Sequence, residues 1–173
     1  MKTADLAEPV RVHQDDSRGV THRPNRLSRQ TTAPCREEDT RNWQGRLSLD
    51  FYKAGNRTCV IPKHSGPLRI QRPFYPESTD NGICHVYVLH PPGGVAPGDL
   101  LDLQLQAGSD AHAVITTPGA TKFYRTESLA STVTQRIALA PNAILEWLPQ
   151  ENIFFNGCNV SVNTRVDLSL IHI

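Results

Sequence analysis

The chain has 173 residues and a formal net charge of +1, and 38% of its residues are hydrophobic. This length suits one domain, with or without a tail. The near-zero charge gives no general electrostatic basis for binding nucleic acid or a membrane surface, so we expect neither as a partner. No segment approaches the roughly 20 apolar residues that a membrane-spanning helix needs.

The first 41 residues differ in composition from the rest. They contain no aromatic residue, but eight Lys or Arg and seven Asp or Glu. Such a segment buries too little apolar surface to offset the entropy lost on ordering, so we expect residues 1–41 to be a disordered extension. It lacks the apolar stretch of a secretory signal, and its acidic residues argue against a transit peptide, so we expect a cytoplasmic protein.

From Trp43 onward, apolar and polar residues alternate with period 2, which is typical of strands with one buried face. Gly and Pro clusters separate the apolar segments, and no window has the pattern and caps of an amphipathic helix. No internal repeat of fixed length is visible. The pattern predicts an all-β fold, either a sandwich or a stacked, solenoid-like sheet. The expected strands are 47–51, 83–89, 101–106, 111–116, 133–139, 143–148 and 160–168.

The stiff loop His90–Asp99 follows the second expected strand. Two prolines fix φ, and glycines permit turns that are closed to other residues. Imidazole and carboxylate both suit Ni or Zn, so His90 and Asp99 could form a polar gate or a weak metal site. Alternatively, Asp99 braces its own loop through hydrogen bonds to backbone amides.

A second turn-rich block, Thr116–Arg125, is not a phosphate-binding loop, because the spacing of its glycines is wrong. After the turn, Phe123 and Tyr124 should face opposite sides of a strand. Lys122, Tyr124 and Arg125 could form part of a partner surface together with His90, since Tyr and Arg often anchor interfaces. Alternatively, Arg125 is a solvated strand residue and Tyr124 lies at the edge of the core.

Glu146 lies between Leu145 and Trp147 in the last block, 145–151. If its strand face points inward, the carboxylate is partly buried and needs a partner. The following run, Ile153–Phe155, fits either core or interface.

The cysteines form no metal-binding pattern. None of the four is part of a CxxC pair, and Cys59, Cys84 and Cys158 lie in or beside apolar runs, so we expect buried free thiols. A closed metal site at Cys84, His85 and His90 is not expected, because neighbouring strand residues point to opposite faces.

The blocks, taken together and in this order, resemble the UreD (UreH) family of urease accessory proteins. The resemblance covers 43–167 and is carried by Trp43–Gly45 with Leu47–Leu49, Gly66–Pro76, Tyr87–Gly94 with Gly98 and Asp99, Thr116–Arg125, and Leu145–Glu151 with Ile153–Phe155.

The resemblance implies a non-catalytic, chaperone-like scaffold that helps to build the nickel centre of urease. Its expected partners are the urease structural subunits, accessory protein F and, through F, the GTPase G. The family fold is mostly β, with stacked, solenoid-like sheets, a smaller helical part and an internal tunnel proposed as a nickel route. By this resemblance Asp99 and Thr121 match polar tunnel positions, and Glu146 is our own looser candidate. We expect no tightly bound cofactor, only transient nickel.

The family runs on well past Asp167, so we expect residues 42–167 to be an incomplete UreD-like domain. Residues 168–173 match the translation of a transposon adapter used in sequencing libraries, and we expect them to be an artefact.

Two other classes of function remain open. An enzyme would need His90, Asp99, Lys122 and Tyr124 to converge in one pocket. A β-sandwich module for a small ligand or sugar would need a compact apolar pocket with few polar groups.

Overall fold

The computed structural model describes residues 2–6, 43–77, 82–126 and 129–169, which form strands and turns without any helix. The expectation of an all-β fold is therefore confirmed. Nothing in this part of the chain forms an apolar helix of membrane-spanning length. The strands are β1 (Lys2–Leu6), β2 (Gln44–Ala54), β3 (Arg57–Ser65), β4 (Arg69–Ile70), β5 (Cys84–Leu89), β6 (Leu100–Ala107), β7 (His112–Thr116), β8 (Thr121–Phe123), β9 (Ser131–Leu139), β10 (Ile144–Leu148), β11 (Asn152–Phe154) and β12 (Val160–Leu168).

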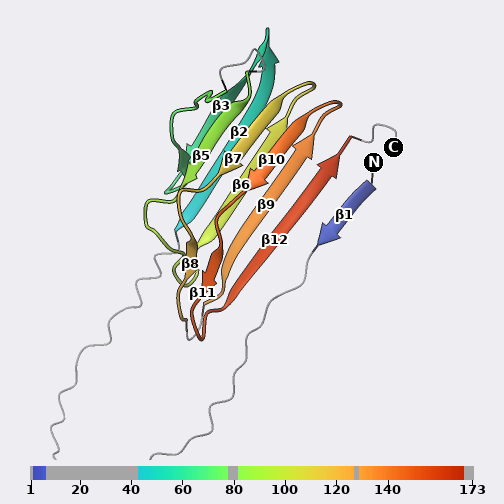
Figure 1. The fold of residues 1–173 in the computed structure, drawn as a ribbon. Helices are drawn as coiled ribbons and strands as arrows, with labels where there is room; N and C mark the ends of the chain where they lie inside the picture. Colours follow the sequence, from blue (N-terminus) through green and yellow to red (C-terminus); the bar gives the residue numbers. More distant parts are fainter. Residues whose placement is uncertain (1, 7–42, 78–81, 127–128, 170–173) are drawn as a thin grey trace, which may run out of the picture.

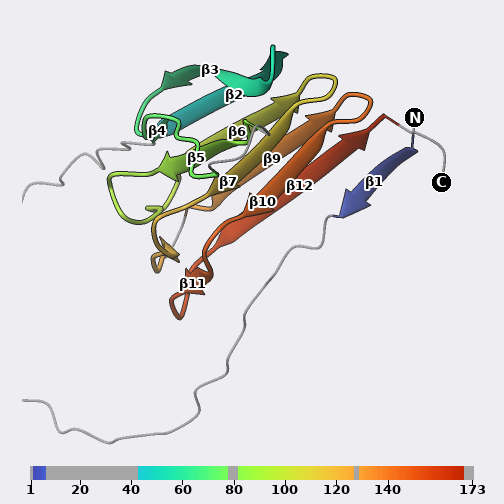
Figure 2. The ribbon, with the colours of Figure 1, turned by 45° about the horizontal axis from the view of Figure 1, so that its top comes forward.

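Successive passes of the chain stack in parallel. Strands β2, β6, β9 and β12 lie side by side in chain order in one sheet, and β5, β7 and β10 do so in a second. Strands β8 and β11 pair in parallel as a third, short sheet. The chain therefore runs from the first sheet to the second, on to the third and back to the first, which is the path of a β-solenoid rather than a sandwich (Figures 1 and 2).

The coils of this solenoid differ in length, which explains why the sequence shows no fixed repeat. Leu100 of β6 pairs with Thr132 of β9, 32 residues later. Ser131 pairs with Val160 of β12 only 29 residues later. The first coil is longer still, since Gln44 of β2 pairs with Leu100 of β6. The extra length comes from β3 and β4, which are inserted into this coil.

Antiparallel strands flank the parallel ladder of the first sheet. Strand β3, which the sequence analysis missed, returns along β2 after a turn at Gly55, whose φ of 60° suits glycine. Strand β1 pairs with β12 at the opposite edge. This strand lies inside the segment 1–41 for which we expected disorder, and the pairing satisfies backbone groups that an edge strand leaves open.

The remainder of that segment, residues 1 and 7–41, lies outside the described residues, so its disorder stays a prediction. The same holds for the artefact expected at 168–173. Of those six residues the structure describes Leu168, which ends β12, and Ser169, whose amide donates to the Leu139 carbonyl at 3.0 Å.

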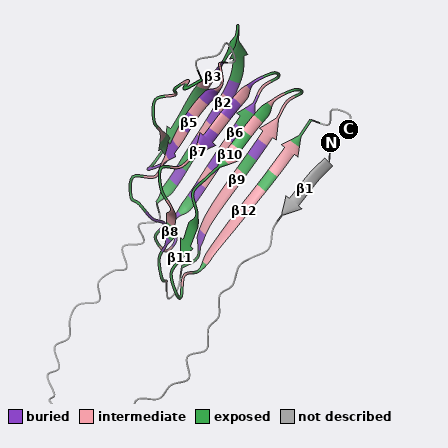
Figure 3. Ribbon diagram, viewed as in Figure 1, coloured by how far each residue is buried: buried purple, intermediate pink, exposed green. Residues whose placement is uncertain are grey.

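The core lies between the first and second sheets and follows the expected alternation. Leu47, Leu49 and Phe51 of β2 are almost completely buried, as are Ala113 and Ile115 of β7. Burial decreases toward the last coil, where the inward-facing valines of β12 are only half-buried (Figure 3). Among the described residues, no strand of the second or third sheet follows β12, so its inner face is less covered than those of β6 and β9.

Candidate functional site

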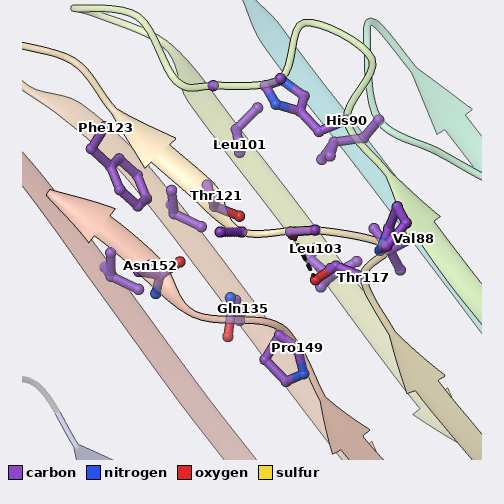
Figure 4. Close-up of a pocket in the computed structure, with 18 of the residues that line it drawn as sticks. Val88, His90, Leu101, Leu103, Thr117, Thr121, Phe123, Gln135, Pro149 and Asn152 are labelled. Atoms are coloured by element: carbon purple, nitrogen blue, oxygen red, sulfur yellow. Dashed lines mark hydrogen bonds between the residues drawn. The ribbon is translucent and has the colours of Figure 1, made fainter.

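A cavity of about 260 Å³ lies between the three sheets, toward the side that β8 and β11 form. Inward-facing side chains of β6, β9 and β12 form one wall, and the second sheet contributes Val88 and Trp147. The β7–β8 turn, with Thr117 and Thr121, and the loop that begins at His90 complete it (Figure 4). Most of the elements that line the cavity belong to the recurring coils, and Leu68 is contributed by the inserted segment between β3 and β4.

The polar groups of this cavity are few and neutral. Apart from the indole N–H of Trp147, the polar side chains are those of His90, Thr117, Thr121, Gln135 and Asn152, and no carboxylate lines the cavity among the described residues. Two of these five side chains already form hydrogen bonds. The Thr117 hydroxyl accepts one from the backbone amide of Gln150 at 2.9 Å, and the side-chain Oε1 of Gln135 accepts one from the Thr164 hydroxyl at 3.1 Å. The site therefore offers oxygen and imidazole donors on a mainly apolar wall.

Sequence reasoning missed Gln135 and Asn152. Gln135 shares the face of Val133 and Ile137, because strand side chains alternate. A polar residue in an otherwise apolar inward row was therefore the signal that could have identified it. Asn152 begins β11, a strand of only three residues that the pattern did not predict.

His90 lines the cavity, and its ring is partly withdrawn from water. Burial lowers the pKa of His90, and the negative charge of Asp99 only partly opposes that shift. Its Nε2 atom is buried without a hydrogen-bond partner in the described structure. Burial therefore favours the neutral form of the imidazole. It lies in the cavity, apart from the outward-facing residues with which we grouped it as a possible partner surface.

Asp99 is only 4% exposed and is not among the residues that line the cavity. Its Oδ2 accepts a hydrogen bond from the Ala96 amide at 2.9 Å, and its Oδ1 accepts one from the Trp43 amide at 3.2 Å. The Asp99 carbonyl accepts from the Thr132 amide at 2.9 Å. These bonds join the loop to β2 and β9, which is the bracing role that we set out as the alternative to metal binding.

Thr121 and Glu146 are the other candidates for a metal path, and their side chains point in different directions relative to the cavity. Thr121 is half-buried at the start of β8 and faces the cavity. Glu146 is on the outer face of β10, where its Oε1 lies 3.0 Å from Nε2 of His112. The inward orientation that would have made Glu146 a cavity residue is not found, because Leu145 and Trp147 occupy the inner face.

Lys122, Tyr124 and Arg125 are exposed at the third sheet. Phe123 is 3% exposed and Tyr124 is 44% exposed, so the expected division between the two faces is confirmed. The enzyme alternative required Lys122 and Tyr124 to meet His90 and Asp99 in one pocket. The structure separates them, because Lys122 and Tyr124 face outward and Asp99 is bonded to backbone amides.

The described residues contain no group of three or more His, Cys, Asp or Glu side chains that could hold a metal ion. The three cysteines in this part of the chain are free. Only Cys84 is fully buried, whereas Cys59 and Cys158 are half-buried, so the expectation of buried thiols is correct for one of the three. Cys35 lies outside the described residues.

Comparison with known proteins gives a consistent match. The family model described as "UreD urease accessory protein" covers residues 44–170. Urease accessory protein UreD of Alcanivorax borkumensis is 47% identical over 133 residues, which is 74% of this chain and 44% of that protein. The corresponding values are 46% over 129 residues, 74% and 47% for the Klebsiella aerogenes protein. For that of Pseudomonas putida they are 48% over 127 residues, 73% and 45%. The chain thus spans a little under half the length of these relatives.

Proposed function

Since this chain belongs to the UreD family of urease accessory proteins, we propose that it is a non-catalytic scaffold for assembling the nickel centre of urease in the cytoplasm. In this role it binds the urease structural subunits on one side and accessory protein F on the other, and through F it meets the GTPase G. The match over 44–170 is the observation that carries the proposal. The outward orientation of Lys122 and Tyr124, away from His90 in the cavity, supports the non-catalytic part of it.

We further propose that the cavity is part of a route for nickel, which is cargo here and not a resident cofactor. Its donors are neutral oxygen and nitrogen groups, so each would hold a divalent cation weakly, and weak successive sites allow an ion to leave as readily as it enters. Thr121 serves this route directly in our proposal. Asp99 serves it by holding the loop, and Glu146 has no direct part because it lies on the outer face.

Co-purification tests the scaffold function. The tagged chain is co-expressed with the urease structural subunits and accessory proteins F and G, the eluted complex is weighed, and nickel-dependent urease activity is assayed. Recovery of the subunits together with activation is the expected result. If none of these proteins elutes with the tagged chain, the scaffold proposal is wrong.

A second candidate function is the binding of a small ligand or sugar. The mainly apolar cavity with few polar groups is the kind of site that such a module uses. Family membership favours the scaffold. If the chain bound a sugar saturably and did not associate with urease, ligand binding would become the better-supported function.

A further inference from the structure

The outer edge of β12 is covered by one short strand. The five residues of β1 pair antiparallel with Thr164–Leu168, and β1 lies alone at this edge of the first sheet in both views (Figures 1 and 2). β12 has nine residues, and within the described chain no strand pairs with Val160–Asn163 on this side. The edge is therefore only partly covered.

The opposite edge of the same sheet is protected in a different way. There β3 carries Pro62, which has no backbone donor, followed by Lys63 and His64. Proline and charged side chains are common means by which edge strands avoid pairing with other chains. β12 has no proline, and its two charged residues, Arg165 and Asp167, pair with each other at 3.1 Å. Its edge therefore depends on β1 for protection.

Few interactions hold β1 at this edge. It is joined to β2 through residues 7–43, and closing a connection of this length costs entropy. A short edge strand with one neighbour opens more easily than a strand that is paired on both sides. β12 itself would stay in place, because it pairs with β9 over all nine residues. Release of β1 would therefore expose the complete edge of an ordered strand.

The inner face of β12 has apolar surface left to cover. Leu168 is 48% exposed, and Val160, Val162 and Val166 are half-buried. An antiparallel pair of two β12 strands, with a two-fold axis at Thr164, aligns all nine residues of each strand. Residues directly opposite each other in such a pair share a face. Val160 would then meet Leu168 of the second copy, and Val162 would meet its Val166.

The outer face of the same pair sets no like charges against each other. Ser161 would lie opposite Asp167 of the second copy, and Asn163 would lie opposite its Arg165. Like charges directly opposite each other destabilise a sheet, and this register avoids them. The edge thus matches a second copy of itself in both its apolar and its charge pattern, as a two-fold interface requires.

We propose that the β12 edge is a self-association site, where β12 of a second copy pairs antiparallel about a two-fold axis at Thr164 once β1 has left. Within each copy, β1 acts as a plug on this site. Addition of a strand to a sheet edge is a common mode of recognition, in which backbone hydrogen bonds supply the affinity. The two-fold pairing closes on itself, so association stops at two copies. This inference does not depend on the proposed scaffold function.

Sedimentation equilibrium tests the role of β1. Deletion of residues 2–6 should tighten self-association at least about tenfold relative to the wild type. Ala4→Pro/Asp5→Pro keeps the chain length but removes two backbone donors from β1, so it should act like the deletion. An excess of a synthetic peptide of residues 1–8 should return the deletion variant to monomers. If both variants self-associate no more tightly than the wild type, or form assemblies larger than two copies, the proposal is wrong.

Charge at Ser161 tests the pairing register. In the deletion variant, Ser161→Lys would face Asp167 of the second copy and should tighten the dimer several-fold, whereas Ser161→Asp should weaken it several-fold. Ser48→Lys and Ser48→Asp are the matched controls, because Ser48 lies on the same outer face but on β2, away from this edge. They should leave the dimer unchanged. Equal effects of Ser161→Lys and Ser161→Asp would exclude this pairing of β12.

Discussion

The Asp99 carboxylate accepts a hydrogen bond from the backbone amide of Trp43, which lies 56 positions earlier in the chain, at 3.2 Å. The same carboxylate binds the Ala96 amide, and the Asp99 carbonyl binds the Thr132 amide. One residue thus connects the start of the first coil, the loop before β6 and the start of β9. A conspicuous acidic residue in a Gly- and Pro-rich loop here holds backbone together, since each of its carboxylate oxygens accepts a hydrogen bond from a backbone amide.

Replacement of Asp99 should therefore reduce stability before it affects anything else. Asp99→Ala leaves two backbone amides without their acceptor, and hydrogen bonds to charged groups contribute about 1.5–3 kcal/mol each. We expect the free energy of unfolding to fall by about 2–4 kcal/mol in urea titrations. Asp99→Asn, which keeps one acceptor oxygen, should lose less. Asp102→Ala, at a partly exposed ion pair, is the control and should change stability by no more than about 0.5 kcal/mol.

A direct metal role for Asp99 would have a different signature. In that case Asp99→Ala would unfold at the wild-type urea concentration and yet lose nickel-dependent urease activation in the co-purified complex.

The sequence predicted the strands well wherever alternation was strong. Leu47, Leu49 and Phe51 are buried as expected because period 2 directly reports one covered face. It could not predict the solenoid from periodicity, because the coils differ in length by three residues between the β6–β9 and β9–β12 steps. The short strands β8 and β11 have too few residues to show any period.

The candidate site was predicted less well, because residue type does not reveal direction. Thr121 and His90 face the cavity, whereas Glu146 faces outward and pairs with His112. The direction of Glu146 depends on which face of β10 the core covers. In the alternating run Leu145, Glu146, Trp147, the sequence predicts an outward Glu146 only if Leu145 and Trp147 are taken as the residues that face the core.

Acid should destabilise the fold through His90. Burial lowers the pKa of His90 below its ordinary value near 6.5, so below that value the unfolded chain binds the proton more tightly than the folded one. The unfolding free energy should therefore fall as pH decreases from about 7 to about 5. His90→Gln should make this dependence shallower, as measured by urea titrations at each pH. His112→Gln is the control, since that ring pairs with a carboxylate at the surface. Identical slopes for wild type and His90→Gln would show that His90 is not the group responsible.

Alkaline pH should destabilise the fold through Cys84. Burial raises the pKa of the Cys84 thiol to about 11 from its ordinary value of 9.0. The unfolded chain releases this proton first, so the stabilising contribution is complete below about pH 9 and is lost as pH rises toward 11. Cys84→Ala should reduce the loss of stability over that range, and Cys158→Ala, at a half-buried position, should not. An equal alkaline slope in wild type and Cys84→Ala would contradict this assignment.

The cavity residue Thr121 and the outer-face residue Glu146 give opposite predictions for nickel transfer. Thr121→Val keeps the shape of the side chain but removes the hydroxyl, so the cavity loses one of its few oxygen donors. Nickel-dependent urease activation should fall several-fold, while the mass of the co-purified complex stays the same. Glu146→Gln keeps a polar group beside His112 on the outer wall and should activate urease like the wild type. If Glu146→Gln were the defective variant and Thr121→Val the normal one, the route for nickel would run along the outside of the second sheet and not through the cavity between the sheets.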